Sequence, residues 1–148
     1  MNNIHRFFLR SSLFICAALA FNATAQVTVK DAWVRGTVPA QTATGAFMTI
    51  TSREDAKLVG ANSTIAAMTE IHQSTMKDGV SHMHAVESVA LPAGKAVKLE
   101  TGGYHMMLMG LSKPVAAGQK VPITLEIVDA KGKRAKVEVQ ADVRPLGR

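Results

Sequence analysis

The sequence predicts an all-β fold, either a sandwich or a Greek-key barrel, with about eight or nine short strands. Two observations support this prediction. Short runs of apolar, often β-branched residues alternate with polar ones, and residues that favour turns separate these runs. In addition, no segment keeps a helical period for more than about one turn.

The first half of the chain contains four of the predicted strands: 27–34, 43–51, 57–62 and 66–72. Trp33 lies near the end of the first strand, and Pro39 precedes the second. His72 ends the fourth strand. Each run is short enough for a strand of a sandwich or barrel.

The second half contains the other predicted strands: 83–89, 96–100, 105–110, 121–128 and 135–143. Turn or loop residues precede them, in order Asp78-Gly79, Pro92-Ala93-Gly94, Gly102-Gly103, the loop 114–118 and Lys131-Gly132. The last two strands are the clearest because every second residue is apolar, as in Ile123, Leu125 and Ile127. We find no internal repeat or linker, so a single domain is expected.

The N-terminal residues resemble a secretory signal peptide. Arg6 and Arg10 form a basic head, residues 13–21 are mostly apolar, and Ala23-Thr24-Ala25 supplies small residues before a cleavage point. We therefore expect residues 1–25 to be removed before Gln26, leaving 26–148 as the exported domain. A buried N-terminal helix is the less favoured interpretation.

Cys16 is the only cysteine, and it lies inside the predicted signal peptide. Phe14 and Ile15 precede it, whereas a lipoprotein signal has small residues there, so we do not expect a lipid anchor. The exported domain would then contain no cysteine. This excludes disulfides, thiol nucleophiles, a thiol redox pair and cysteine-ligated zinc or blue-copper sites.

The charge pattern gives no indication of a nucleic-acid or membrane partner. The chain has a formal net charge of +6, and its densest basic run, 131–136, is expected to be a solvated hairpin tip. No aromatic residues are interleaved with these charges, as nucleic-acid binding would favour. After the signal peptide, no apolar run is long enough to span a membrane.

Histidine and methionine are concentrated in one part of the exported domain. Its four histidines are His72, His82, His84 and His105, and its seven methionines are Met48, Met68, Met76, Met83, Met106, Met107 and Met109. All four histidines and five of the methionines lie between positions 72 and 109. An even distribution along the chain would not produce this cluster.

Strand alternation predicts which of these side chains meet. His105 and Met107 would share one face of a strand, while Met106 would point into the core. Residues 73–83 can fold back at Asp78-Gly79 and bring Met83 near His72. Such an arrangement gathers two imidazoles and two thioethers. Met48 and Met68 are expected in the core, and Met109 in the core or a pocket wall.

This donor set favours one metal. Thioether sulfur is a soft, neutral ligand that suits Cu(I), whereas zinc sites use cysteine, histidine or carboxylate, and magnesium and calcium prefer oxygen. Outside the cytoplasm, thioethers also avoid the oxidation to disulfides that would disable a thiolate site.

The spacing H-x10-M-x21-H-x-M, from His72 through Met83 to His105 and Met107, resembles that of the periplasmic copper chaperone PCu(A)C family. The surrounding segments Glu70-Ile71-His72, Gly102-Gly103-Tyr104-His105 and Leu108-Met109-Gly110-Leu111 fit as well. The resemblance covers essentially the whole exported domain.

This resemblance implies a cupredoxin-like β-barrel that binds one Cu(I) through His72, Met83, His105 and Met107. It also implies a periplasmic metallochaperone, not an enzyme. Its partners would be the CuA centre of cytochrome c oxidase subunit II, a Sco-type thiol protein, or both.

The chain departs from the family pattern beside Met83. His82 and His84 either face away from the site or offer imidazoles to Cu(II); together with Met76 they are candidate auxiliary ligands. The His/Met-rich C-terminal tail of some members is absent from this sequence, which ends at Arg148.

The sequence favours three other functions less. A copper storage or resistance protein would be expected to carry many Met or His repeats rather than one compact set. A blue-copper electron carrier would need a cysteine ligand. A metal-free binding module would make the cluster a coincidence.

Overall fold

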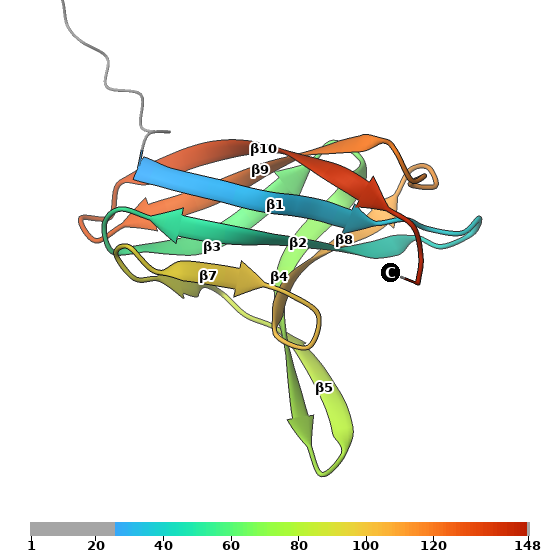
Figure 1. Ribbon diagram of the computed structural model, residues 1–148, viewed down its shortest axis with the longest axis horizontal. Coiled ribbons are helices and arrows are strands. Elements are labelled where there is room, and N and C mark those ends of the chain that lie inside the picture. The colour runs from blue at the N-terminus through green and yellow to red at the C-terminus, as the bar shows by residue number, and fades with distance from the viewer. Residues whose placement is uncertain (1–25, 148) are drawn as a thin grey trace, which may run out of the picture.

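The computed structural model describes residues 26–147, and its regular elements there are ten β-strands (Figure 1). They are β1 (Val27–Arg35), β2 (Ala43–Ser52), β3 (Ala56–Ser63), β4 (Ala66–Lys77), β5 (Val80–Ala85), β6 (Val89–Leu91), β7 (Ala96–Leu99), β8 (Tyr104–Leu111), β9 (Lys120–Asp129) and β10 (Arg134–Arg144). The all-β prediction is confirmed. No helix in this part of the chain is long and apolar enough to cross a membrane. The predicted signal peptide lies outside the described residues.

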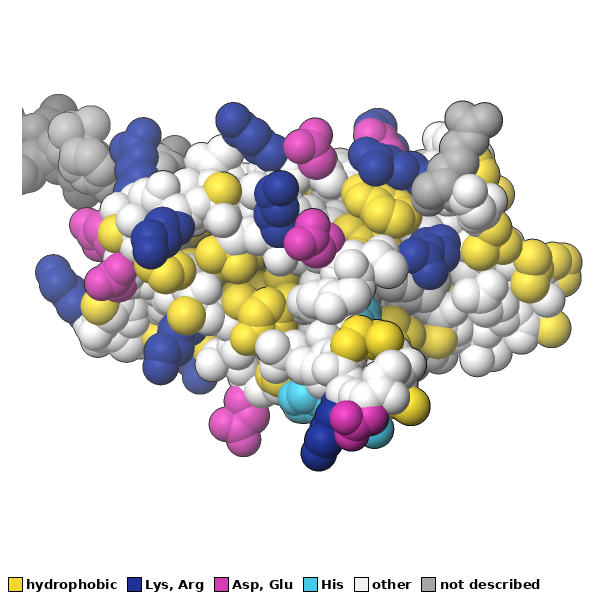
Figure 2. All heavy atoms as spheres, turned by 60° about the horizontal axis from the view of Figure 1, so that its bottom comes forward, with side chains coloured by type: hydrophobic (Ala, Val, Ile, Leu, Met, Phe, Trp, Pro, Cys, Tyr) yellow, Lys and Arg dark blue, Asp and Glu magenta, His cyan; other side chains and the backbone are white. Residues whose placement is uncertain are grey.

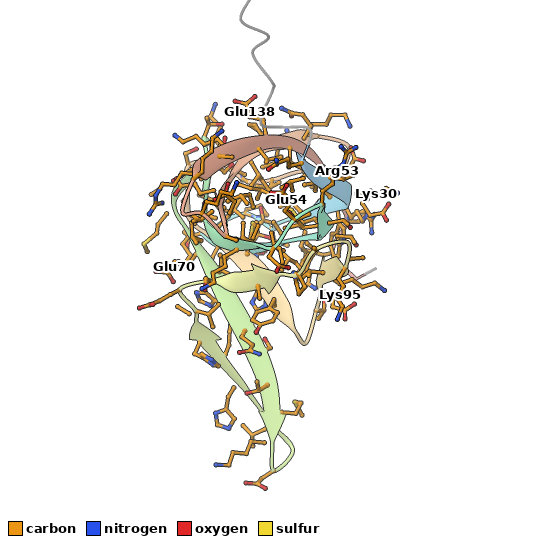
Figure 3. The ribbon with its side chains drawn as sticks, turned by 90° about the vertical axis from the view of Figure 1, so that its left-hand side faces the viewer. Lys30, Arg53, Glu54, Glu70, Lys95 and Glu138 are labelled. Carbon is orange, nitrogen blue, oxygen red and sulfur yellow. The ribbon has the colours of Figure 1, made fainter. Side chains whose placement is uncertain are left out.

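All ten strands belong to one sheet. Its order is β5-β4-β8-β2-β1-β10-β9-β3-β6, and β7 pairs with β2 beside this path. Strands β1 and β10 run parallel, whereas the other pairs are antiparallel. Seen end-on in Figure 3, the sheet is rolled around its side chains. It does not close into a complete barrel, because β5 and β6 each have only one neighbour in the sheet.

The core lies on the inner face of the rolled sheet. Met106 and Leu108 of β8 are fully buried there, as the alternation predicted, and Met48 of β2 is buried as well. Other fully buried side chains come from across the sheet: Ile50, Leu58, Leu91, Ile123 and Leu125. Burying each such side chain contributes roughly 1.5–3 kcal/mol to folding.

A β-bulge in β1 decides which side chains of that strand face outward. Between Lys30 and Trp33 the register with β2 shifts, and Asp31 in between has a φ of 52°. Val27 packs inward before the bulge and Val34 after it, although their positions differ by an odd number. Trp33 is thereby placed on the outer face, opposite Phe47 of β2.

Strands β4 and β5 form a hairpin that projects from the body (Figure 1). Its turn, Asp78-Gly79, has φ angles of 52° and 77°, as a type I′ turn requires. The sequence predicts one strand over 83–89 and a hairpin-like loop over 73–83. The structure instead continues β4 to Lys77, and β5 and β6 are separate strands.

Candidate metal centre

The two predicted histidine ligands lie directly opposite each other on neighbouring strands. His72 of β4 pairs with His105 of β8, and Glu70 pairs with Met107. Directly opposed residues of an antiparallel pair share a face. The face is the outer one, because the intervening Ile71 and Met106 are buried in the core. The His72 and His105 ring centroids are 5.9 Å apart.

The two ring nitrogens of His72 differ, because one is hydrogen-bonded and the other has no hydrogen-bond partner among the described residues. Its Nε2 lies 2.8 Å from a carboxylate oxygen of Glu70. Its Nδ1 is buried and has no hydrogen-bond partner within the described chain. A buried polar atom without a partner is costly and needs an explanation. If Nε2–H is donated to Glu70, the Nδ1 lone pair is free to bind a metal.

His105 is held from its other ring nitrogen. The side chain is 5% exposed, and its Nδ1 lies 3.2 Å from the carbonyl oxygen of Gly103. The same carbonyl accepts a hydrogen bond from the Ser74 amide of β4. A tight turn between β7 and β8, in which Gly103 N–H donates to Glu100, therefore fixes the imidazole. Nε2 is the nitrogen left for a ligand.

The two predicted thioethers line a pocket of about 250 Å³ together with His105. Met107 enters it from β8. Met83 enters from β5, where it pairs with Ser74 and therefore lies on the same face as His72. Met83 is 55% exposed, so it is the most accessible of the four predicted ligands. His72 adjoins the pocket through its contact with the His105 ring.

Aromatic rings continue from the histidines across the outer face. Trp33 stacks on Phe47 at 4.4 Å between centroids, and Phe47 lies 6.3 Å from His105 at a similar tilt. Gly45 makes room for this row, because a Cβ there would come within 2.8 Å of the Phe47 ring. Phe47, with Trp33 stacked on its other side, therefore packs beside the His105 ring.

Two arginines cover the same aromatic rings. The Arg35 guanidinium lies 5.5 Å from the Phe47 centroid and also lines the pocket, and that of Arg144 lies 4.8 Å from the Trp33 centroid. The surroundings of the candidate centre thus combine cations and aromatics.

Two residues before Arg144 on β10, the hydrogen bond and charge of Lys120 hold the pKa of Asp142 below its ordinary value of 3.8.

The structure separates the candidate auxiliary residues. Met76 lies on the same face of the hairpin as Met83 but nearer its exposed tip. His82 and His84 pair with Thr75 and Gln73, so they lie on the opposite face from Met83. They do not join the other four side chains. Figure 2 shows histidine side chains near the hairpin, which comes forward in that view.

The expectation for Met68 is wrong. It is 52% exposed, because it lies on the outer face of β4 two residues before Glu70. Its cross-strand neighbour Met109 is half-buried and also faces outward. Apolar character alone suggested the core for Met68, but the register decides otherwise.

The donor chemistry of these residues suits a soft, singly charged metal ion. Within residues 26–147, His, Cys, Asp and Glu do not gather in any group of three or more able to hold a metal. A metal bound here would therefore depend on thioether sulfur beside the two imidazoles. Thioethers favour Cu(I) over zinc or calcium.

Glu70, Phe47 and Arg35 were not recognised as parts of the site from the sequence. The available signal for Glu70 was its position two residues before His72 on a strand, which places both on one face. Phe47 and Arg35 come from distant strands, and only the sheet order brings them together.

Together the rolled sheet and the His/Met cluster define a β-domain of the PCuAC type. The copper-bound PCuAC domain from PmoF2 matches with a TM-score of 0.66, 20% identity, and coverage of 83% of this chain and 96% of that one. The Cu(I) form of DR1885 from Deinococcus radiodurans matches with a TM-score of 0.60, 32% identity, and coverage of 84% and 85%. The predicted resemblance to the PCu(A)C family and the cupredoxin-like fold class are confirmed.

Comparison of the sequence with known families and proteins shows which family the chain belongs to. The model of the family described as "Putative lipoprotein LpqE-like" matches residues 27–143. The protein "Putative lipoprotein Lxx21020" of Leifsonia xyli subsp. xyli is 36% identical over 115 residues, which span 77% of this chain and 69% of that protein. The chain belongs to the LpqE-like family.

Proposed function

We propose that this protein binds one Cu(I) ion through His72, Met83, His105 and Met107 and carries it as cargo. The observation that supports this most directly is the buried Nδ1 of His72, which has no hydrogen-bond partner among the described residues. It lies on the face that also carries the His105 ring and the Met107 thioether. The proposed role of the protein is to bind and transfer copper rather than to catalyse a reaction.

Two lines of support favour Cu(I) over other ions. The set combines neutral imidazole and thioether donors, which suit a soft monovalent cation. In addition, the related structures include a copper-bound PCuAC domain and DR1885 with Cu(I).

The proposed release mechanism is stepwise ligand exchange. His105 is buried and held by Gly103, whereas Met83 is largely exposed on the edge strand β5. An incoming acceptor ligand reaches the metal most easily from the Met83 side. Met83 therefore leaves first, and the two imidazoles and the Met107 thioether hold copper until a second acceptor ligand binds.

The direct test is an anaerobic titration of residues 26–148 with Cu(I) against a coloured Cu(I) chelator. We expect one tightly bound equivalent, and a large loss of affinity in His105→Ala and in Met107→Ala. Met68→Ala is the matched control, because Met68 is an exposed thioether on the same outer face outside the proposed set. Unchanged affinity in both ligand variants would contradict the proposed site.

We further propose that the chain acts in the periplasm and delivers copper to the CuA centre of cytochrome c oxidase subunit II, with a Sco-type thiol protein as a second partner. Export is supported by the signal-peptide pattern and by the lipoprotein descriptions of the family and relative. The test is mixing Cu(I)-loaded protein with the soluble CuA domain, with and without the reduced thiol protein. Copper should appear on the CuA domain; retention on this chain in both mixtures would contradict delivery.

A further inference from the structure

His82 and His84 occupy one face of an exposed edge strand. In the register of the hairpin, His82 lies opposite Thr75 and His84 opposite Gln73, while Met83 between them lies opposite Ser74. The two imidazoles therefore share the face that is turned away from Met83 and the proposed Cu(I) site. Figure 1 shows β5 in the hairpin that projects from the body, and in the sheet order β5 is an edge strand.

Both side chains are free to bind something from solution. All of β5 is exposed, and β4 is its only neighbour in the sheet. The hydrogen bonds made by histidine side chains within residues 26–147 belong to His72 and His105. The hairpin thus presents two accessible imidazoles that no described contact engages.

The spacing of the pair suits chelation. Two residues along a strand separate Cα atoms by about 6.6 Å, and both side chains stand on the same side of the sheet. A metal–nitrogen bond is about 2 Å long, so one ion can bind two imidazoles whose donor atoms come within about 4 Å. Parallel side chains at this spacing can converge to that distance.

We propose that His82 and His84 form a second metal site, which binds Cu(II). Of the divalent first-row ions, Cu(II) binds nitrogen ligands most tightly, and imidazole suits it. Water, and the side-chain amide oxygen of the adjacent Gln73, would complete the coordination. The pair contains no thioether, so it favours the oxidised ion, while the opposite face of the same strand carries a thioether for the reduced one.

This site is independent of the proposed Cu(I) function, because the two share no ligand. The test is a titration of untagged residues 26–148 with Cu(II) alone in the presence of a weak competing chelator, followed by electron paramagnetic resonance. His84→Gln alone should weaken Cu(II) binding roughly 100-fold, because chelation requires both imidazoles, and His82→Gln/His84→Gln should weaken it further. Both positions are exposed, so the substitutions should leave the fold intact, and circular dichroism checks this.

The matched control is His72→Gln/His105→Gln, which should retain the same Cu(II) equivalent. A second readout is NMR: Cu(II) should broaden the amide signals of β5, Gln73 and Thr75 in the wild-type protein. Cu(II) affinity unchanged in His82→Gln/His84→Gln, or lost only from the His72/His105 variant, would overturn the proposal. The Cu(I) titration of His82→Gln/His84→Gln should match that of the wild type, so failure of one site is distinguishable from failure of the other.

Discussion

His72 can offer Nδ1 to a metal only while its proton stays on Nε2, and Glu70 is the group that favours this tautomer. The carboxylate lies 2.8 Å from Nε2. We predict that Glu70→Ala lowers Cu(I) affinity roughly 10- to 100-fold, since hydrogen-bonding partners of metal-bound histidines typically have effects of this size. The same chelator competition measures the change.

The conservative variant separates positioning from simple structural damage. Glu70→Gln should recover part of the affinity, because its amide oxygen can still accept the Nε2–H hydrogen bond. Glu138→Ala is the control, because Glu138 is an exposed carboxylate on β10, far from Glu70 in Figure 3. Equal affinity in Glu70→Ala and wild type would remove Glu70 from the site.

Gly45 is a second residue whose role depends on one close approach. A methyl group there would lie 2.8 Å from the Phe47 ring, so Gly45→Ala must displace that ring from its place between Trp33 and His105. We predict a loss of about 1–3 kcal/mol in the free energy of unfolding, typical of overpacking. Denaturant titration measures it. Adding Phe47→Leu should restore part of the lost unfolding free energy. If nothing is restored, the loss does not come from a clash with the Phe47 ring.

At the scale of elements, the β4–β5 hairpin is the part that carries Met83, and its turn should control the site. Gly79 has a φ of 77°, which an alanine adopts at a cost of roughly 1–2 kcal/mol. We predict that Gly79→Ala increases hydrogen exchange along β5 and weakens Cu(I) binding. The global melting temperature should change little, because the side chains of β5 are all exposed and add nothing to the core.

Gly132 supplies the comparison. It has a φ of 81° in the turn between β9 and β10, and neither strand contributes a proposed ligand. Gly132→Ala should therefore destabilise the fold without changing Cu(I) affinity. Equal effects of both variants on affinity would show that global stability, rather than the hairpin, controls the site.

The elements differ in how far sequence could predict them. Strands with one buried face, such as β9 and β10, alternate clearly, and their predicted ranges agree with the structure within one residue at each end. The segment Gln73–Lys77 reads as a loop, because neither of its faces is fully buried where the hairpin leaves the body: Gln73 and Ser74 are half-buried, and residues 75–77 are exposed. The bulge at Asp31 is not predicted either, since the one extra residue shows only in the pairing of β1 with β2 and not in the kinds of residue present.

The candidate site shows the same division. Spacing along the chain was enough to group His72, Met83, His105 and Met107 by resemblance. The orientation of His82 and His84 required the register of β4 with β5, and the contact of Phe47 with His105 required the order of β2 and β8. Pairing between distant strands depends on the packing of the whole sheet and leaves no local signal.

At the scale of the whole molecule, the sheet separates stability from function between its two faces, and the adjacent residues Met106 and Met107 test this. Met106 is fully buried in the core, whereas Met107 faces the pocket. We predict that Met106→Ala costs about 2–5 kcal/mol of unfolding free energy, as a buried truncation does. Met107→Ala should cost far less stability but remove most of the Cu(I) affinity. Denaturant titration and chelator competition on both variants measure the two quantities. A large stability loss in Met107→Ala, or a large affinity loss in a still-folded Met106→Ala, would show that the two faces are coupled through the sheet.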